Sequence, residues 1–350
     1  MGEKQRNTRR LLLVGPSTGA VHLENYYNLI QDYFDQILII TTHPIDYCDF
    51  EIVDFSFKSP LKIISQIRRM RAIMNDFNPG LIHVHQVGTG GYLAAQANKK
   101  KYPLVVTAWG SDVLLLPKQG VLKKHVVKRV LMDATIITVD ANFMADTIRN
   151  LGIKNEIQVA NFGIVLKDIE NPEKQNIIYS NRLHKDLYNI DLILKGFSKF
   201  VKLHPDWKLI VAAKGSNTEK LKQIAQNLLS KDQYEFIGFV DQDTNLKMYQ
   251  KAKIWVSVPD SDGTAISLLE AMGYGCIPVT SDLPANREWI NDNENGIIVK
   301  NDLSEALEKA LQLDHDQLAK YNESLVKNKA TKKVNREIFV EIYNKILERC

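Results

Sequence analysis

The chain has 350 residues, of which 45% are hydrophobic and 25% are charged. These proportions are typical of a soluble protein with two globular domains, and they exclude a disordered chain or a fibrous repeat. The formal net charge of +4 is too small for a protein that coats nucleic acid. The three cysteines lie far apart, without a CxxC pair. They therefore predict neither a disulfide framework nor a zinc ribbon, and they favour a reducing compartment.

The longest apolar runs fall far below the roughly 20 residues that a membrane-spanning helix needs. The first ten residues are basic, but the apolar stretch after them is too short for a secretory signal. The sequence therefore predicts a cytoplasmic protein.

The first half of the chain alternates short apolar or β-branched runs with segments of helical length. The runs predict strands at Leu11–Val14, Ile37–Thr42, Leu81–His85, Leu104–Thr107 and Ile136–Val139. Helices are expected between them, among others at Leu61–Asp76, Gly91–Lys100 and Val121–Leu131. Because parallel strands need crossover connections of this kind, the pattern predicts an α/β domain with a doubly wound parallel sheet.

A polar stretch that contains Pro172 interrupts this pattern, and we interpret residues 164–176 as a linker between domains 1–163 and 177–334. In the second domain, strands are expected at Ile177–Tyr179, Lys208–Ala213, Tyr234–Ile237, Ile254–Val258, Ile277–Thr280 and Ile297–Val299. Helices are expected at Asp191–Leu203, Thr218–Leu229, Asn245–Lys251, Ala265–Tyr274 and Asp302–Leu313. A long helical tail is expected over Asp316–Cys350, with its last helix, about 335–350, packed back on the first domain.

Residues 260–275 carry the clearest functional pattern. A polar turn with Gly263 follows an expected strand, and a helix is expected to begin near Thr264, a candidate N-cap. The free N–H groups of its first turn would suit a diphosphate. Asp262 and Glu270 lie roughly two helical turns apart, so each could hold hydroxyls at a different point along an extended ligand. A nucleoside-diphosphate sugar has that shape.

A simpler interpretation gives both acids structural roles, with Asp262 capping the helix and Glu270 on its solvated face. Leu268, Leu269 and Met272 surround Glu270 in the sequence, however, and an unpaired carboxylate is costly in such a setting. The surroundings of Glu270 therefore favour a ligand-binding role.

The segment Ser261–Val279 resembles the acidic-x7-Glu signature of the retaining glycosyltransferases of the large GT4 family, which adopt the GT-B fold. Similar segments follow the family's order through nearly the whole chain: Gly15–Gly19 with His22, Thr107–Asp112, Asn161–Gly163, Asn181–Leu183, Phe236–Val240, Ser281–Ile290 and Asn295–Gly296. The resemblance implies two Rossmann-like domains that face a central cleft, with the donor on the C-terminal domain and the acceptor on the N-terminal domain.

In this family an arginine and a lysine neutralise the donor diphosphate. Arg182 matches the arginine, whereas Tyr188 and Asn189 stand where many members have Lys-Gly, so Lys185 is our candidate for the second cation. Asp262 replaces the usual glutamate and would hold sugar hydroxyls, and Glu288 is a weaker candidate near the sugar. The other donor contacts that the resemblance implies are Gly15, Gly19, Gly238, Phe239, Val240, Gly263, Thr264, Ala265 and, on the ribose, Glu270.

On the acceptor side the resemblance points to His85, Trp109 and Asp112. Trp109 stands where the family often has a histidine, and it would either stack on a sugar or fill the core. His83 and His85 alternate along one expected strand. His85 would face the acceptor or, like His83, have a structural role.

Two further patterns carry less weight. Asp260 and Asp262 spell the DxD pattern of metal-dependent glycosyltransferases of another fold. Their place late in the second domain argues against that role, so no metal or other cofactor is expected. Gly15–Gly19 is not followed by the Gly-Lys-Ser/Thr of a P-loop.

Basic residues concentrate in the N-terminal domain. Residues 99–129 contain eight of them against Asp112 alone: Lys99, Lys100, Lys101, Lys118, Lys123, Lys124, Lys128 and Arg129. A solvated helix face would account for three or four such charges. The larger number predicts contact with anionic lipid, at about 1 kcal/mol per basic residue near the surface. No aromatic ladder accompanies the charges, so a nucleic-acid partner is not expected.

These features predict a metal-independent retaining glycosyltransferase. It would move a sugar from a nucleotide donor, expected to be a UDP-sugar, to a glycan or lipid-linked acceptor in surface polysaccharide synthesis. The alternatives are a GDP-sugar donor, a nucleotide-sugar epimerase of the same fold and a non-catalytic scaffold. The basic domain would place the enzyme at the inner face of the membrane.

Overall fold

The computed structural model describes residues 9–16, 20–167 and 173–348. The chain divides into two compact units. The N-terminal unit comprises Met1–Phe162 together with Lys332–Cys350, and the C-terminal unit comprises Gly163–Thr331. Each unit has its own parallel sheet with helices on both faces, as the alternation of strands and helices in the sequence predicts.

The N-terminal unit is built on a seven-stranded sheet whose described strand pairs are all parallel. Its strands are β1 (Arg10–Val14), β2 (Gln36–Thr41), β3 (Phe50–Ile52), β4 (Leu81–His85), β5 (Leu104–Thr107), β6 (Ile136–Val139) and β7 (Glu156–Val159). Their order across the sheet is β3-β2-β1-β4-β5-β6-β7. The five strands predicted from the sequence form the middle of the sheet, and the two edge strands β3 and β7 are additional.

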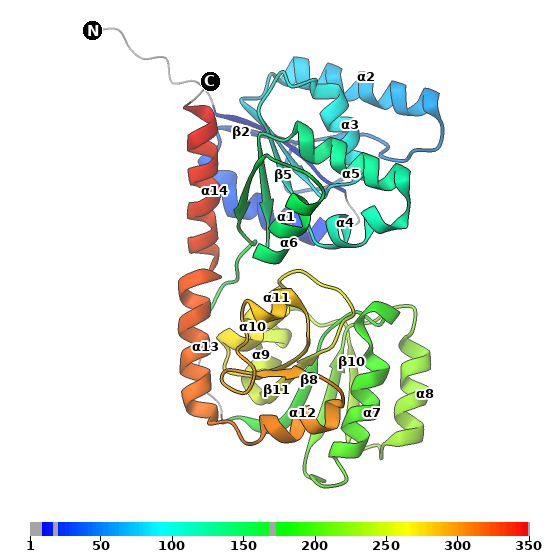
Figure 1. The fold of residues 1–350 in the computed structure, drawn as a ribbon, viewed down its shortest axis with the longest axis vertical. Helices are drawn as coiled ribbons and strands as arrows, with labels where there is room; N and C mark the ends of the chain where they lie inside the picture. Colours follow the sequence, from blue (N-terminus) through cyan, green and yellow to red (C-terminus); the bar gives the residue numbers. More distant parts are fainter. Residues whose placement is uncertain (1–8, 17–19, 168–172, 349–350) are drawn as a thin grey trace, which may run out of the picture. The chain divides into compact units, whose positions relative to one another are not determined.

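Helices cover both faces of this sheet (Figure 1). They are α1 (Ala20–Ile30), α2 (Pro60–Phe77), α3 (Thr89–Asn98), α4 (Ser111–Leu114), α5 (Val121–Asp133), α6 (Asn142–Asn150) and α14 (Lys332–Leu347), with short 3₁₀ turns η2 (Gln31–Tyr33) and η3 (Leu116–Gln119). Helix α3 packs against both α2 and α5. On the other face, Phe339 and Tyr343 of α14 join Tyr26 of α1 in a buried core, so the end of the chain completes the N-terminal unit.

The C-terminal unit has a six-stranded parallel sheet in the order β10-β9-β8-β11-β12-β13. Its strands are β8 (Gln175–Ser180), β9 (Lys208–Ala212), β10 (Tyr234–Gly238), β11 (Ala252–Ser257), β12 (Ile277–Ser281) and β13 (Ile297–Val299). Its helices are α7 (Ile190–Phe200), α8 (Thr218–Leu228), α9 (Gln242–Lys251), α10 (Ile266–Gly273), α11 (Pro284–Arg287), α12 (Leu303–Ala310) and α13 (His315–Lys329), with a 3₁₀ turn η4 (Asp186–Tyr188).

The strands of the C-terminal unit bury side chains on both faces. Ile178 belongs to a core that includes Phe197 of α7, whereas its neighbour Tyr179 belongs to a second core that includes Leu268 of α10. Successive side chains of a strand point to opposite faces, so these two cores sandwich the sheet. This arrangement explains why the strands are continuous apolar runs in the sequence.

The predicted helical tail is interrupted. Helix α13 ends at Lys329, and α14 begins at Lys332. Between them, the carbonyl of Ala330 accepts a hydrogen bond from the backbone N–H of Ile164 at 2.8 Å, and Thr331 pairs with Ile164 in a parallel bridge. The helical tail therefore consists of two helices, because this pairing takes the backbone out of helical geometry between them. None of the described helices is long and apolar enough to cross a membrane.

The strand order of each sheet defines where a ligand would be expected to bind. Successive connections change direction between β1 and β4 in the N-terminal unit and between β8 and β11 in the C-terminal unit. At such switch points the loops after neighbouring strands diverge and leave a crevice at the carboxyl edge of the sheet. Each unit therefore has one expected ligand crevice.

Candidate functional site

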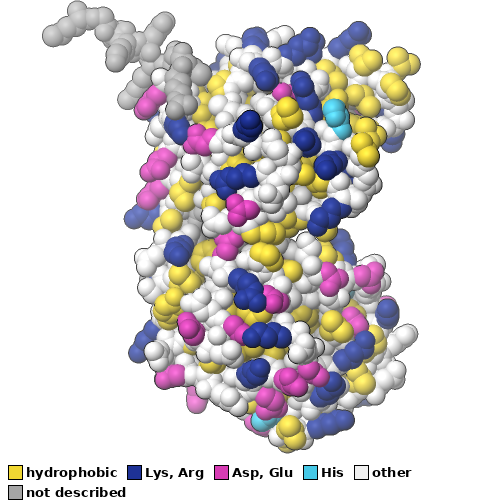
Figure 2. Space-filling model, in the orientation of Figure 1, with side chains coloured by type: hydrophobic (Ala, Val, Ile, Leu, Met, Phe, Trp, Pro, Cys, Tyr) yellow, Lys and Arg dark blue, Asp and Glu magenta, His cyan; other side chains and the backbone are white. Residues whose placement is uncertain are grey.

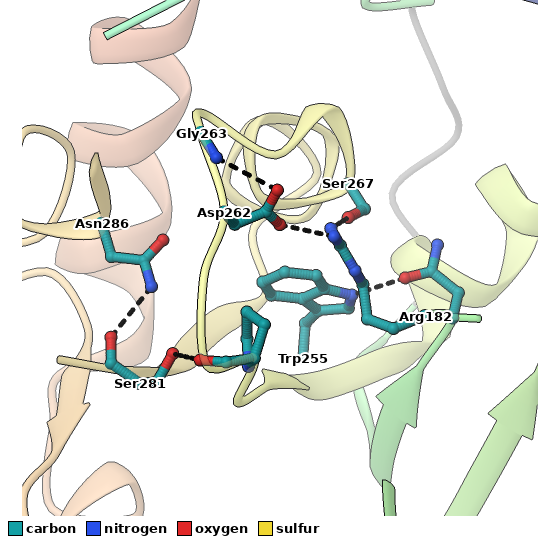
Figure 3. Close-up of polar contacts among 9 residues, drawn as sticks. Arg182, Trp255, Asp262, Gly263, Ser267, Ser281 and Asn286 are labelled. Carbon is teal, nitrogen blue, oxygen red and sulfur yellow. Dashed lines mark hydrogen bonds and ion pairs between the residues drawn. The ribbon is translucent and has the colours of Figure 1, made fainter. Parts of the chain in front are cut away.

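Arg182 and Asp262 meet at the switch point of the C-terminal unit. Arg182 follows β8 and Asp262 follows β11, the two strands that flank the switch. The guanidinium donates from Nη2 to Oδ2 of Asp262 at 2.5 Å and from Nη1 to Oγ of Ser267 at 2.9 Å (Figure 3). The two charged side chains are only 12% and 24% exposed. The structure thus brings the predicted diphosphate-binding and sugar-binding residues together.

The environment of Asp262 acts on its pKa in two directions. Burial raises the pKa of this carboxyl, while the neighbouring Arg182 charge and hydrogen bonds lower it. Arg182 also lies over the ring of Tyr188, 4.6 Å from its centroid, which fixes the guanidinium from a third side. Asp260, the other acid of the DxD pattern, accepts instead from Nδ2 of Asn189 at 2.7 Å. The two aspartates of that pattern therefore have separate partners.

Helix α10 begins beside this ion pair. Its first residue is Ile266, and its N-cap is Ala265, which offers no side-chain cap. The expectation that Thr264 caps the helix is wrong, because the Thr264 hydroxyl accepts from Nε1 of Trp289 at 3.3 Å. Ser267, the partner of Arg182, lies in the first turn. The arginine cation and the uncapped N–H groups of α10 are therefore adjacent, an arrangement that suits a doubly charged anion.

The loop that holds Asp262 and Gly263 is fixed by the next strand. The Ser281 hydroxyl donates to the carbonyl of Pro259 at 2.8 Å, and Nδ2 of Asn286 donates to the carbonyl of Ser281 at 2.9 Å. These bonds connect the loop after β11 to β12 and α11 (Figure 3). Glu288 is the C-cap of α11.

Glu270 lies in the second turn of α10 and is largely withdrawn from solvent. Nδ2 of Asn245 donates to its Oε2 at 3.4 Å. Burial raises the pKa of the Glu270 carboxyl, and hydrogen bonds from Tyr249 and Asn245 lower it in part. The sequence-based argument that this glutamate needs partners is therefore correct, and α9 supplies neutral ones.

Gly238 is the last residue of β10, the strand next to β9, and Phe239 follows it. Gly238 has a φ of 74°, a conformation that favours glycine, and its carbonyl accepts from the N–H of Ala213 at 2.6 Å. This bend leaves the Phe239 side chain 68% exposed, whereas Val240 packs against the core. An exposed aromatic side chain at the carboxyl edge of a sheet is available to a planar ligand.

The predicted second cation, Lys185, is exposed at the start of η4. A different lysine, Lys214, lies at the end of β9 with its side chain against Gly238. Its carbonyl accepts from the N–H of His184 at 3.3 Å, so the loops after β8 and β9 are joined. Lys214 was not among the sequence candidates. Its place directly after a strand at the carboxyl edge of the sheet is the signal that could have found it.

In the N-terminal unit, Gly15 and His85 lie at the switch point between β1 and β4. Both line a cavity of about 410 Å³ at the carboxyl edge of the sheet, together with Gly88, Gly90 and Gly91 around the start of α3. The Gly15 N–H donates to the carbonyl of Ile40 at 3.1 Å. Gly19, another predicted donor contact, lies outside the described residues.

The three acceptor-side candidates form one cluster. Nε1 of Trp109 donates to Nδ1 of His85 at 3.3 Å. The Asp112 carboxylate accepts from the backbone N–H groups of Trp109, at 3.0 Å, and of Val87, at 2.7 Å. Asp112 thus ties the loops after β4 and β5 together, and it fixes the backbone on which Trp109 is carried.

His83 is buried among hydrogen-bonding partners, as the structural role considered for it requires. Its Nδ1 lies 2.7 Å from the Tyr343 hydroxyl, and its Nε2 lies 2.7 Å from Oγ1 of Thr107. Complete burial lowers the pKa of His83 to about 3, so the ring is neutral. Burial and the neighbouring histidines also lower the pKa of His85.

Comparisons with known proteins agree with this architecture. The family model described as "Glycosyl transferases group 1" matches residues 166–332, and the model "Glycosyl transferase 4-like" matches residues 10–141. The alpha-monoglucosyldiacylglycerol synthase of Streptococcus pneumoniae is 23% identical over 312 residues, which cover 79% of this chain and 70% of that protein. The phosphatidyl-myo-inositol mannosyltransferase of Mycolicibacterium smegmatis is 24% identical over 248 residues, covering 68% and 63%.

Solved structures share the two-unit fold along nearly the whole chain. A glycosyltransferase from Rickettsia africae superposes with a TM-score of 0.81 at 16% identity and covers 98% of this chain and all of its own. Anabaena HepE, solved in complex with UDP-glucose, superposes with a TM-score of 0.79 at 13% identity and covers 96% and 99% of the two chains. The chain therefore belongs to the group 1 glycosyltransferases and has the GT-B fold.

Proposed function

We propose that the protein transfers a sugar, with retention of its anomeric configuration, from a nucleoside-diphosphate donor to a glycan or lipid-linked acceptor. The observation that carries the proposal is the contact of Arg182 with Asp262 and Ser267 at the start of α10. It combines a cation, an uncapped helix N-terminus and a carboxylate at one switch point. The donor diphosphate would bind to the first two and the donor sugar would lie against Asp262.

In the proposed reaction the bond between the anomeric carbon and the donor phosphate breaks, and a bond to an acceptor hydroxyl forms on the same face. The hydroxyl proton passes to the departing diphosphate. Arg182 and the N–H groups of α10 stabilise the negative charge that develops on that group. These groups supply the positive charge that a metal ion supplies in other transferases, so we propose a metal-independent reaction. Glu270 would hold the ribose.

UDP-sugars are our first choice of donor, supported by the UDP-glucose complex of Anabaena HepE. A thermal-shift screen with UDP, GDP and their sugars tests this choice, because a ligand that binds only the folded protein raises its unfolding midpoint. We expect UDP and a UDP-sugar to raise the midpoint. If only GDP or a GDP-sugar raises the midpoint, the donor is a GDP-sugar. If none of these ligands raises the midpoint, the proposal is contradicted.

The reaction type needs a separate assay. With donor and a lipid or glycan acceptor, the product glycoside should keep the anomeric configuration of the donor, which proton NMR coupling constants report. EDTA should leave the rate unchanged. An epimerised nucleotide sugar formed without acceptor would instead support the epimerase alternative. Inversion at the anomeric carbon would contradict retention.

We further propose that the N-terminal unit contacts an anionic membrane through residues 116–125. Val121 and Leu122 at the start of α5 are 88% and 72% exposed, and Lys118, Lys123 and Lys124 beside them are exposed as well. Figure 2 shows hydrophobic and basic side chains together, with few acidic ones, on the side of this unit that carries α2 and α5. Exposed aliphatic side chains beside lysines suit the boundary between lipid headgroups and acyl chains. Two relatives named above act on lipids according to their names.

Vesicle flotation tests this contact. The protein should bind vesicles with anionic lipid, bind neutral vesicles weakly, and dissociate as salt increases. Replacement of Val121 and Leu122 by Ser should reduce binding about tenfold. Leu203→Ser is the matched control, because Leu203 is a 73% exposed leucine of the C-terminal unit. Equal binding to neutral and anionic vesicles, or equal losses in both variants, would contradict the proposal.

A further inference from the structure

Glu270 has an unusual set of partners for a withdrawn carboxylate. It lines a small recess with Asn245, Tyr249, Tyr274 and Lys167. Lys167, the cation of this recess, is paired with Asp243 at 2.8 Å. The contacts recorded to the Glu270 carboxylate come from neutral donors on α9. The orientation of those donors therefore decides whether Glu270 can remain a hydrogen-bond acceptor.

The donor groups are oriented by a chain of hydrogen bonds that starts at Trp255. An indole N–H can only donate. Nε1 of Trp255 donates to Oδ1 of Asn181 at 2.9 Å, which turns the Nδ2 group of Asn181 the other way (Figure 3 shows the indole). That Nδ2 donates to the Tyr249 hydroxyl at 2.7 Å and to Oδ1 of Asn245 at 3.0 Å. The indole N–H of Trp255 thus sets the direction of every hydrogen bond in this series.

Asn245 is the last residue in this series of hydrogen bonds. Its Oδ1 accepts from Asn181 and also from the hydroxyl of Tyr179 at 2.7 Å. With two donors on its oxygen, the amide must direct its NH₂ group at Glu270, where Nδ2 lies 3.4 Å from Oε2. The opposite orientation would place two acceptors against each other inside the protein. Tyr179 and Trp255 are buried, so water cannot easily replace these bonds.

We propose that Trp255, Asn181 and Asn245 are positioning residues that present an N–H donor to Glu270 and so keep its carboxylate an acceptor for the ribose hydroxyls of the donor. This inference rests on the proposed function and adds to it a specificity for nucleotides with ribose hydroxyls. The charged and titratable groups around Glu270 fit this role. They are Tyr179 on β8, Tyr249 on α9, Tyr274 after α10, and Lys167, which is paired with Asp243.

The test compares UDP with 2′,3′-dideoxy-UDP by calorimetry, in wild type, Asn245→Asp, Trp255→Phe and Asn328→Asp. The wild-type protein should bind UDP at least about tenfold more tightly, the effect of a hydrogen bond to a charged group. Asn245→Asp keeps the oxygen that Tyr179 and Asn181 need but removes the donor to Glu270. At pH 8 it should lose most of the preference for UDP. Asn328 is exposed on α13, so Asn328→Asp matches the charge change and should keep the wild-type preference.

The pH dependence separates positioning from general damage. As the pH falls, the new carboxyl at position 245 and Glu270 share one proton, and the protonated group can again donate to Glu270. The preference of Asn245→Asp for UDP should therefore recover between about pH 8 and pH 5.5. Trp255→Phe keeps the ring but frees the two amides to turn over. The Trp255→Phe variant should show a preference for UDP over 2′,3′-dideoxy-UDP that is about threefold to tenfold smaller at every pH.

Each outcome bears on one of the two proposals. If wild type binds neither nucleotide, the proposed function fails and the positioning role fails with it. If wild type prefers UDP but both variants keep that preference, the positioning role alone is overturned. The same holds if the variants lose affinity for both nucleotides equally at every pH. Far-UV circular dichroism and the unfolding midpoint of each variant show whether its fold is kept, and Trp255→Phe provides the test if Asn245→Asp does not fold.

Discussion

Arg182 makes three contacts at the carboxyl edge of its sheet, and a bound diphosphate would compete with one of them. The ion pair with Asp262 at 2.5 Å joins the two opposite charges in this structure. A diphosphate that takes over the guanidinium would release Asp262 toward the sugar hydroxyls. The contacts with Ser267 and Tyr188 would hold the guanidinium in place during this exchange. The ion pair therefore positions both residues for this exchange.

Arg182→Ala should weaken UDP binding by about 1.5–3 kcal/mol, or roughly 10- to 100-fold in Kd, because a charge-assisted contact is lost. Isothermal titration calorimetry measures this directly. Arg149→Ala is the control, since Arg149 forms an exposed ion pair with Asp146 in the N-terminal unit. An unchanged Kd in Arg182→Ala would remove this residue from the donor site.

Single residues also show where sequence reasoning stops. The pairing of Arg182 with Asp262 spans 80 positions, yet both could be selected because each follows a strand of a recognisable pattern. Lys214 also follows an expected strand, but its sequence position does not show what its side chain contacts. Its side chain lies against Gly238 only because β9 and β10 are neighbours, and strand order is a property of the folded sheet. The amide orientations of Asn181 and Asn245 likewise depend on contacts among four separate elements.

Among the elements, α14 contributes buried side chains to the core of the N-terminal unit. Phe339 is fully buried and lies 5.0 Å, between ring centroids, from Tyr26 of α1. The Tyr26 and Tyr343 hydroxyls are hydrogen-bonded to each other beside His83. A helix from the end of the chain thus shares a core with the first helix and the central strands.

Phe339→Ala should destabilise the N-terminal unit by about 3–5 kcal/mol, because it leaves a cavity in this core. Denaturant unfolding measured by circular dichroism would show a lower midpoint. Glu337→Ala, an exposed change in the same helix, should have little effect. Similar midpoints for the two variants would show that α14 is not needed for the stability of this unit.

The central strands could be predicted because they are buried on both faces and carry continuous apolar runs. Strand β3 has three residues and β7 four, and both lie at sheet edges where burial is incomplete. Their sequences therefore lack that signal. The position of the break between α13 and α14 could not be predicted, because its cause is the pairing of Thr331 with Ile164, which is remote in sequence.

At the scale of the molecule, the residues proposed for the nucleotide are concentrated in the C-terminal unit. Arg182, Asp262, Glu270 and Phe239 all lie within Gly163–Thr331. The basic segment 116–125 lies in the N-terminal unit, so donor binding and membrane contact are assigned to separate bodies. Each of the two units therefore has its own proposed role, which explains why the chain is long enough for two domains.

UDP should therefore slow hydrogen exchange in the C-terminal unit, at the start of α10 and in the loops after β8, β10 and β11. The amides of α14, α1 and α5 in the N-terminal unit should exchange at unchanged rates, since UDP alone is not expected to contact them. Mass spectrometry of peptic fragments measures both units in one experiment. Protection confined to the N-terminal unit would contradict the assignment of the nucleotide site.

The chain leaves the N-terminal unit after Phe162 and returns to it at Lys332, beside the point where it left. The C-terminal unit is continuous, whereas the N-terminal unit needs α14, which is synthesised after the whole C-terminal unit. During synthesis, therefore, the first sheet leaves the exit tunnel without α14 over one apolar face. The C-terminal unit has all its strands before that face is covered. The N-terminal unit would then complete its fold after the C-terminal unit, and its uncovered apolar face is where a nascent-chain chaperone would be needed.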